Sequence, residues 1–347
     1  MFKRLLLITM ICVLILSLAA CGNYTIDDTS PPSVSVETED PFAAIEENVF
    51  LAAISHGTSN PNRAEDQRKL PFEYNGGEFS FDYKYSVTGK LNTVGFLLFL
   101  DGKPQPYRTD RNESYEYCHI FPSEETGVFT LSFYPQHGNA GDTLDLSIVS
   151  ITNPDFRPDM KETSSYGWYH KSLEYWTELY FNESASADIP LQAKAADVFS
   201  NVTIQEEKIT SAYIEKLRQN GWDGVTMDDL DQSVYYTTDF NGSIVYDNFC
   251  LSDSDEVVFR YTICGTPSAE YDISFFIDHQ AVYIDNDLSY HVALSKGNQW
   301  VFEITFDTSK MDSFHTFYVM AVPKNSGSDV LLVLKSNSIL LYQENGQ

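Results

Sequence analysis

The chain has 347 residues and carries a formal charge of −28 at pH 7, from 50 acidic and 22 basic side chains. A chain of this length usually divides into more than one domain. The charge argues against nucleic acid and anionic lipid head groups as partners, because both repel a strongly acidic surface. We therefore expect no nucleic-acid partner. The acidic side chains form either a solvated surface without a specific ligand or, as the alternative, a cation-binding surface.

Residues 1–20 have the parts of a secretory signal peptide. Two basic residues open the chain, an apolar run follows over residues 5–18, and small residues precede Cys21. The apolar run is shorter than the roughly 20 residues that span a bilayer. The ending Leu18-Ala19-Ala20-Cys21 resembles the lipobox of bacterial lipoproteins, and this resemblance covers the signal region alone. It implies cleavage before Cys21, acylation of its thiol with palmitate as the expected chain, and an extracytoplasmic protein anchored to the cell membrane. An ordinary signal peptide that contains a Cys is the alternative.

Residues 21–70 predict a tether. The stretch 22–41 is rich in Thr, Ser, Pro and Asp and has too few apolar side chains to offset the entropy of ordering. A short helix over residues 42–54 is possible, because Pro41 precedes this stretch and no proline interrupts it.

Residues 71–154 predict a first β-sandwich. From residue 79 to residue 87, aromatic and β-branched side chains alternate strictly with polar ones, which is the period of a half-buried strand. A second strand at 96–100 ends in Asp101-Gly102, a dipeptide suited to a tight hairpin. Two more strands are expected at 128–134 and 143–151. Short strands at this spacing are typical of an antiparallel sandwich or barrel.

The same four strands recur in residues 236–347. On the first strand, the match is between Phe81, Tyr83, Tyr85 and Val87 and, in the repeat, Val257, Phe259, Tyr261 and Ile263; on the second, it is between residues 96–101 and 273–278. On the third strand, the match is between Phe129, Leu131 and Phe133 and, in the repeat, Phe302, Ile304 and Phe306. On the fourth, it is between Leu144, Leu146 and Ile148 and, in the repeat, Phe317, Val319 and Ala321. A shared order with small changes in spacing indicates a tandem repeat. We therefore predict an all-β fold with two tandem antiparallel β-sandwich domains of the Ig-like kind, in which Asp101 and Asp278 occupy equivalent turns.

Residues 155–235 predict an interdomain segment that contains helices at 193–199 and 211–220, the second ended by Asn220-Gly221. Aromatic side chains crowd its first part, and four of them are the candidate ligand-binding residues: Trp168, Tyr169, Tyr175 and Trp176. Flat aromatic faces stack on sugar rings and lead protein interfaces. Packing between the two domains is the alternative role, and both remain open.

No sequence motif for catalysis or cofactor binding is present. Phosphate-loop, dinucleotide, zinc-protease and nucleophile-elbow patterns are all missing, and the seven His residues are dispersed. Three Asp-rich stretches, at 228–231, 253–256 and 285–287, lack the pattern of an EF-type calcium loop. Cys118, Cys250 and Cys264 make an odd set, so we expect them reduced rather than part of a disulfide framework. We expect no cofactor, no metal and no catalytic residue.

A membrane-anchored binding module for a glycan or an envelope protein is the leading functional hypothesis, and an enzyme is the less favoured class. A secreted hydrolase that uses dispersed Asp and Glu residues and a structural lipoprotein of envelope assembly are the alternatives.

Overall fold

The computed structural model describes residues 52–66, 69–156, 166–186, 196–253, 256–311, 314–324 and 331–343. Leu51–Gln347 groups into one compact unit. The expected signal peptide and most of the expected tether lie outside the described residues. Ala52–Thr58 is a β-strand, so the helix expected over 42–54 does not extend to its predicted end. Within the described ranges, no helix is long and apolar enough to cross a membrane.

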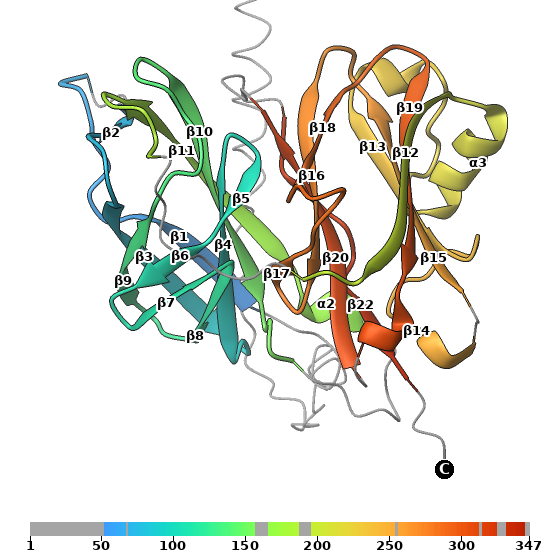
Figure 1. The fold of residues 1–347 in the computed structure, drawn as a ribbon, viewed down its shortest axis with the longest axis horizontal. Coiled ribbons are helices and arrows are strands. Elements are labelled where there is room, and N and C mark those ends of the chain that lie inside the picture. Colours follow the sequence, from blue (N-terminus) through green and yellow to red (C-terminus); the bar gives the residue numbers. More distant parts are fainter. Residues whose placement is uncertain are drawn as a thin grey trace, which may run out of the picture. The chain divides into compact units, whose positions relative to one another are not determined.

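The first sandwich packs two sheets around an aromatic core (Figure 1). One sheet contains, in spatial order, β1 (Ala52–Thr58), β3 (Phe79–Gly89), β9 (Gly127–Phe133), β6 (Tyr107–Thr109) and β7 (Asn112–Glu116). The other contains β2 (Phe72–Tyr74), β11 (Ser172–Phe181), β10 (Thr143–Thr152), β4 (Thr93–Leu100) and β5 (Lys103–Gln105), with β8 (Cys118–Pro122) also paired to β4. Side chains alternate along β3 as expected, with Tyr83 and Tyr85 buried and Asp82 and Lys84 exposed.

The second sandwich repeats this arrangement. Its first sheet contains β12 (Phe199–Lys208), β19 (Asn298–Phe306), β15 (Val257–Gly265) and β13 (Val234–Phe240). Its second sheet contains β14 (Asn248–Cys250), β22 (Ile339–Tyr342), β20 (Phe314–Pro323), β16 (Glu270–Ile277) and β17 (Gln280–Ala281), with β18 (Tyr290–Ala293) on β16 and β21 (Leu334–Lys335) on β20. Short helices connect the strands: α2 (Tyr166–Tyr169), α3 (Ser211–Gln219) and the 3₁₀ turns η2 (Asp229–Asp231), η3 (Leu251–Asp253) and η4 (Thr308–Lys310).

The strand pairing confirms the all-β fold with tandem sandwiches. The order β1-β3-β9 in one sandwich corresponds to β13-β15-β19 in the other, and β2-β11-β10-β4 corresponds to β14-β22-β20-β16. In both, the remaining strands pair antiparallel while one short strand pairs parallel with its neighbour, β2 with β11 and β14 with β22. Asp101 and Asp278 begin equivalent turns and both have a left-handed backbone, with φ of 47° and 46°. All six residues compared on β9 and β19 lie in the two cores.

Two of the predicted correspondences are wrong by two residues. Phe81 pairs with Leu131 and Phe259 with Ile304, so Phe81 is equivalent to Phe259 and not to Val257. On the next strands, Leu100 pairs with Leu146 and Ile277 with Phe317, which makes Leu146, and not Leu144, the equivalent of Phe317. A shift of two residues keeps the same side chains on the same face, so an alternating pattern cannot detect it.

Residues 155–235 are not a separate interdomain segment. Strand β11 belongs to the first sandwich, whereas β12, α3 and β13 belong to the second. The sequence concealed β11 because Trp176 and Tyr180 are aromatic on the face opposite to Tyr175, which blurs its alternation. The helix expected over 193–199 falls partly outside the described residues, and its last residue starts β12. The helix expected over 211–220 is confirmed as α3.

A shared apolar cluster joins the two sandwiches. The outer faces of β4 and β10 contribute Leu97, Phe99, Val149 and Ile151, and those of β16 and β20 contribute Phe276, Tyr318, Met320 and Val322. The equivalent residues Phe99 and Phe276 meet with ring centroids 6.1 Å apart. His279 donates from Nε2 to the Pro154 carbonyl at 2.7 Å, which adds a polar tie. Both faces of these strands are therefore buried, which explains their continuous apolar runs.

Candidate ligand-binding site

Of the four aromatic residues expected to bind a ligand, the three with described side chains do not form one site. Tyr175 and Trp176 are consecutive on β11 and point to opposite faces of the sheet. The hydroxyl of Tyr175 lies 2.8 Å from Thr58 Oγ1 and its ring packs against the first core, 5.9 Å from Tyr83. Tyr169 stacks on Phe156 with centroids 3.9 Å apart. The side chain of Trp168 lies outside the described part of the chain. Tyr175 therefore packs inside the first sandwich, and Tyr169 packs against Phe156.

A different aromatic cluster surrounds Trp222, directly after helix α3. The helix ends at Gln219 with Asn220 as its C-cap, and Gly221 takes the left-handed conformation with φ of 91°. The Gly221 amide donates to the Arg218 carbonyl at 3.2 Å, and the Trp222 amide donates to the Leu217 carbonyl at 3.1 Å. These two bonds are the Schellman motif, which places an apolar side chain after the glycine against the last helical turn. Trp222 and Leu217 accordingly share one apolar cluster.

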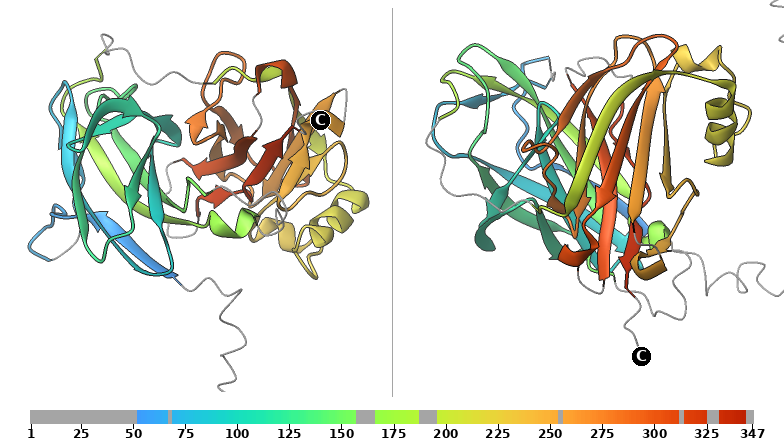
Figure 2. Two further views of the ribbon diagram at one scale, coloured as in Figure 1. Left: turned by 90° about the horizontal axis from the view of Figure 1, so that it is seen from below. Right: turned by 45° about the vertical axis from the view of Figure 1, so that its right-hand side comes forward.

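The edge strand β13 holds the indole on its other side. Trp222 donates from Nε1 to the Tyr236 carbonyl at 3.1 Å. Its ring lies edge-on to two neighbours, with centroids 5.1 Å from Tyr235 and 6.2 Å from Tyr236. Tyr246 stands beside them with 51% of its surface exposed, and its hydroxyl donates to the Gln219 carbonyl at 2.8 Å. The helix end, the edge strand and the following loop thus bring three Tyr side chains close to Trp222, with Tyr235 and Tyr236 on opposite faces of β13 (Figure 2 shows α3 beside this sheet).

Two surface hollows adjoin Trp222. The small hollow, of about 210 Å³, is lined by Asn220, Gly221, Trp222, Tyr236, Thr238, Val245, Tyr246 and Asn337. The large hollow, of about 610 Å³, is lined by Gly221, Trp222, Asp223, Gly224, Val225, Asp229, Gln232, Ser233 and Tyr235. Gly221 and Trp222 belong to both. The large hollow falls in the size range of small-molecule sites, about 300–1,000 Å³, and combines aromatic walls with a few polar groups as such sites do.

Polar groups at the hollows are available to a ligand. The side-chain amides of Gln232 and Asn337 make no hydrogen bond with any other described residue, and both residues are exposed. Asp229 Oδ2 accepts from the Thr226 amide at 2.9 Å and from Thr226 Oγ1 at 2.6 Å, and these bonds lower the pKa of that carboxyl. The carboxylate therefore stays ionised at neutral pH. No Lys or Arg is among the described residues that line either hollow.

One feature of the sequence does point to this site, although the density of aromatic residues along the chain does not. Asn220-Gly221 marks the helix end, and the next residue, Trp222, is apolar. Such a residue is typical of the position after the glycine of a Schellman motif. The cluster around Trp168 drew attention because its aromatics are close in sequence, whereas Tyr235, Tyr236 and Tyr246 reach Trp222 only through the fold.

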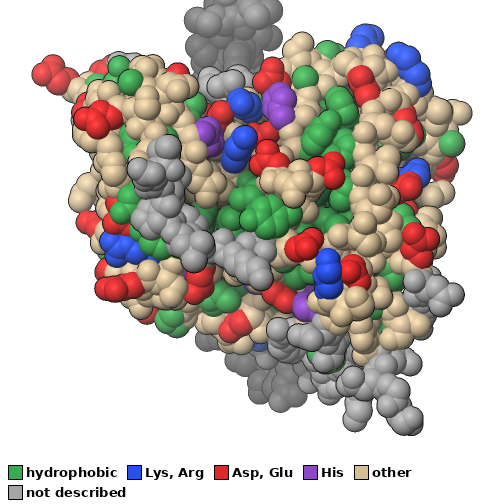
Figure 3. Space-filling model, viewed as in Figure 1, with side chains coloured by type: hydrophobic (Ala, Val, Ile, Leu, Met, Phe, Trp, Pro, Cys, Tyr) green, Lys and Arg blue, Asp and Glu red, His purple; other side chains and the backbone are tan. Residues whose placement is uncertain are grey.

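A second polar cluster lies at the turn between β4 and β5. Lys324 Nζ lies 3.1 Å from Asp101 Oδ2, and His291 Nδ1 lies 3.3 Å from Asp272 Oδ1. Burial raises the pKa of both Asp101 and Asp272. The face in Figure 3 shows lysine, histidine and acidic side chains gathered near β5, β16 and β18. Both oxygens of Asp272 and Oδ1 of Asp101 are buried without a hydrogen bond, so a substrate cannot reach them as a catalytic pair.

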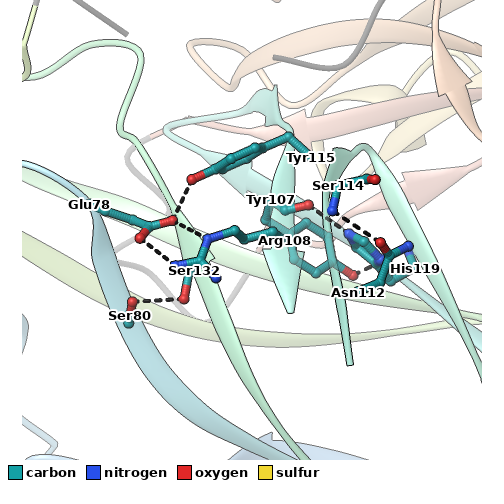
Figure 4. A network of polar contacts seen from close by, with 9 residues as sticks. All are labelled: Glu78, Ser80, Tyr107, Arg108, Asn112, Ser114, Tyr115, His119 and Ser132. Atoms are coloured by element: carbon teal, nitrogen blue, oxygen red, sulfur yellow. Dashed lines mark hydrogen bonds and ion pairs between the residues drawn. The ribbon is translucent and has the colours of Figure 1, made fainter. Parts of the chain in front are cut away.

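A third polar network braces the sheet edge of the first sandwich (Figure 4). Arg108 donates to both oxygens of Glu78 at 2.7 Å, and Tyr115 also donates to Glu78. The Arg108 guanidinium holds the pKa of Glu78 below its usual range. Ser80 donates to Ser132 at 2.7 Å between β3 and β9. Since the partners satisfy one another, this network connects β3 to the β6–β7 hairpin rather than offering free groups to a ligand.

Cysteine chemistry does not add a reactive group. Cys118, Cys250 and Cys264 are buried and free. Burial raises the pKa of the Cys118 and Cys264 thiols to about 12, so neither is a thiolate at neutral pH. In the described ranges, no group of three or more His, Cys, Asp or Glu side chains has the geometry to hold a metal ion. Residues 254–255 of one Asp-rich stretch fall outside those ranges.

No family model matches the chain, and no curated protein matches it. Among solved structures, the chain is similar to fibronectin(III)-like modules of CbhA from Clostridium thermocellum, with 10% identity and a TM-score of 0.20, over 85% of this chain and 98% of that chain. It is also similar to the C-terminal domain of the Streptococcus agalactiae polypeptide BspA (8% identity, TM-score 0.19, covering 84% and 100%). A third is the Salmonella enterica SafA pilin in complex with the SafB chaperone (8% identity, TM-score 0.23, covering 85% and 98%). The two β-sandwiches are established by the strand pairing, and these likenesses add no argument.

Proposed function

We propose that the chain is a lipid-anchored, extracytoplasmic module that binds glycans at the Trp222 site. The observation that carries the proposal is the position of one indole between two hollows that also contain Tyr side chains, free amides and a carboxylate. Aromatic faces pack against the apolar faces of sugar rings, while amides and carboxylates bond to the hydroxyls.

The arrangement should also keep the entropic cost of ligand binding low. Trp222 is held from both sides by α3 and β13, so little side-chain entropy is lost when a ligand binds. Tyr246 is exposed but tied by its hydroxyl to the helix end, which limits its motion in the same way. A site that is largely preformed favours affinity from a small contact area.

The proposed anchor is the acylated Cys21 of the mature chain, on the resemblance of residues 18–21 to a lipobox. Cys21→Ser would remove the thiol that receives the lipid and leave an unprocessed or released protein. Labelling with a palmitate analogue, followed by detergent-phase partitioning, measures both consequences. A Cys21→Ser protein that still takes up label, enters the detergent phase and migrates as the mature protein would contradict the anchor. It would leave the glycan proposal unaffected.

The binding experiment uses the full chain, extracted in detergent, on an array of matched-length oligosaccharides, followed by titration of the best hit. Tyr246→Ala should weaken binding about ten-fold, which corresponds to about 1.4 kcal/mol and agrees with the size of one aromatic contact. The matched control is Tyr283→Ala, which removes another exposed Tyr (43% exposed) of the second sandwich away from the hollows. Equal effects of the two substitutions, or an array without any hit, would overturn the proposal. Hydrolysis of the hit would favour the hydrolase alternative.

A further inference from the structure

We infer that the ligand is a neutral or amino-bearing oligosaccharide at least two sugar units long, which straddles Trp222, and that the site disfavours acidic glycans. This inference rests on the proposed function of the Trp222 site. It concerns two further properties, the length of the ligand and its charge, that glycan binding alone does not determine.

The length follows from the arrangement of the two hollows. Both are bounded by Gly221 and Trp222, so they are neighbours and not separate pockets. Tyr235 and Tyr236 are consecutive on β13 and therefore face opposite sides of the sheet. One contributes to the large hollow and the other to the small hollow. A single unit in the large hollow leaves the small hollow, with Tyr246 and Asn337, without a ligand contact. A second unit next to the first fills it.

Glycine at position 221 leaves room for this connection. A Cβ at Gly221 would meet no heavy atom within 4 Å, so the backbone there borders open space. Since φ of 91° is a conformation that side-chain-bearing residues rarely adopt, glycine is also required by the helix end itself. The linkage between the two sugar units can thus cross over the main chain without meeting a side chain.

The charge preference follows from the carboxylates of the large hollow. Asp223 and Asp229 line it, while the described lining residues include no Lys or Arg. The basic side chains in the vicinity are paired with carboxylates outside the hollow: Arg218 Nη1 lies 3.3 Å from Glu215 Oε2, and Lys296 is paired with Asp231. A uronate or sialic acid would therefore face two like charges without an unpaired cation to offset them. The hydroxyls of a neutral sugar can donate hydrogen bonds to these carboxylates, and an amino sugar gains attraction.

The test is isothermal titration of the full chain with matched oligosaccharides of one to four units, in neutral, amino-bearing and uronate series. Affinity should rise from one unit to two or three and then level off. At low salt, uronates should bind about ten-fold more weakly than neutral sugars of the same length, because each charge repels at the few-ångström range. This penalty should shrink towards about two-fold in 1 M salt, where screening acts within about 3 Å.

Two variants test the length preference and the charge preference of the site separately. Asn337→Ala should weaken the binding of two-unit ligands more than that of one-unit ligands, and so reduce the gain from the second unit. Asp223→Asn should reduce the penalty on uronates, while the control Asp285→Asn, an exposed carboxylate of the same sandwich outside both hollows, should not change it. Uronates that bind as well as neutral sugars, or affinity independent of length, would overturn this inference while the glycan site stands. Failure of every series, with Tyr246→Ala equal to Tyr283→Ala, would instead remove the proposed function.

Discussion

The two sandwiches share their strand order but differ in what precedes one edge strand. This strand is β1, paired with β3, in the first sandwich and β13, paired with β15, in the second. In the second sandwich, β12, α3 and η2 precede β13, and they bring Trp222 to the sheet edge. In the first sandwich, the equivalent strand β1 begins the described residues, and the β6–β7 hairpin takes the place of β12 beside the central strand. The duplicated strands supply core and junction, whereas the candidate site combines the duplicated edge strand β13 with α3 and the loop after it, which have no equivalent within the described chain.

The largest expected effect is on the free energy of unfolding, and it concerns the duplicated cores of the two sandwiches. Phe129→Ala and Phe302→Ala remove fully buried rings at equivalent positions, so each should lower the free energy of unfolding by about 3–5 kcal/mol. Because the two sandwiches share an apolar cluster, both variants should unfold in one transition. Urea denaturation followed by circular dichroism and by Trp fluorescence measures this. Separate transitions for the two probes would show that the sandwiches unfold independently.

Much of this duplicated part could be predicted from the sequence, because alternation at period two identifies strands and their faces. Register could not, since a shift of two residues leaves the same faces buried. Strand β11 was missed because Trp176 and Tyr180 mask its pattern. The site was misplaced for a different reason: Trp222, Tyr235 and Tyr246 are separated along the chain, and only the packing of α3 on β13 brings them together.

The loss of folding stability at acid pH should arise mainly from His residues that precede β11 in the chain. Burial lowers the pKa of His56 and His137 to about 4 and that of His170 to about 2. These side chains remain neutral in the folded chain, while the unfolded chain takes up protons as the pH falls below about 6.5. Stability is therefore lost as the pH falls from about 6.5 towards 4. At pH 5.5 each such His costs about 1.4 kcal/mol.

This difference is measured by the free energy of unfolding at pH 7.5 and pH 5.5. His137→Gln should reduce the loss between these values by about 1.4 kcal/mol. The control His291→Gln alters a more exposed His of the second sandwich, at 45% side-chain exposure, and should reduce it much less. An equal reduction by both substitutions would assign the acid sensitivity to both sandwiches.

A smaller effect is expected where the two sandwiches meet. Burial raises the pKa of Asp272, whose Oδ1 has only His291 Nδ1 close by, at 3.3 Å, and whose Oδ2 is buried without a hydrogen bond. Its contribution to stability is greatest when it is protonated and is lost as the pH rises through its folded pKa. Asp272→Asn should therefore raise the free energy of unfolding at pH 8 by about 1 kcal/mol. At pH 4 the gain should be smaller. Thermal unfolding at both pH values, with Asp285→Asn as control, tests this; a loss of stability at pH 8 would mean that the carboxylate is stabilised by its His291 partner.

The most direct test of the account is a fluorescence titration of the full chain with the best array hit, in the wild type and in Trp222→Phe. The chain has four Trp residues, and only Trp222 lines the two hollows among the described residues. Binding should change the wild-type emission, and Trp222→Phe should both abolish most of that change and weaken the affinity several-fold. An unchanged emission response with unchanged affinity in Trp222→Phe would place the ligand elsewhere and contradict the assignment of this site.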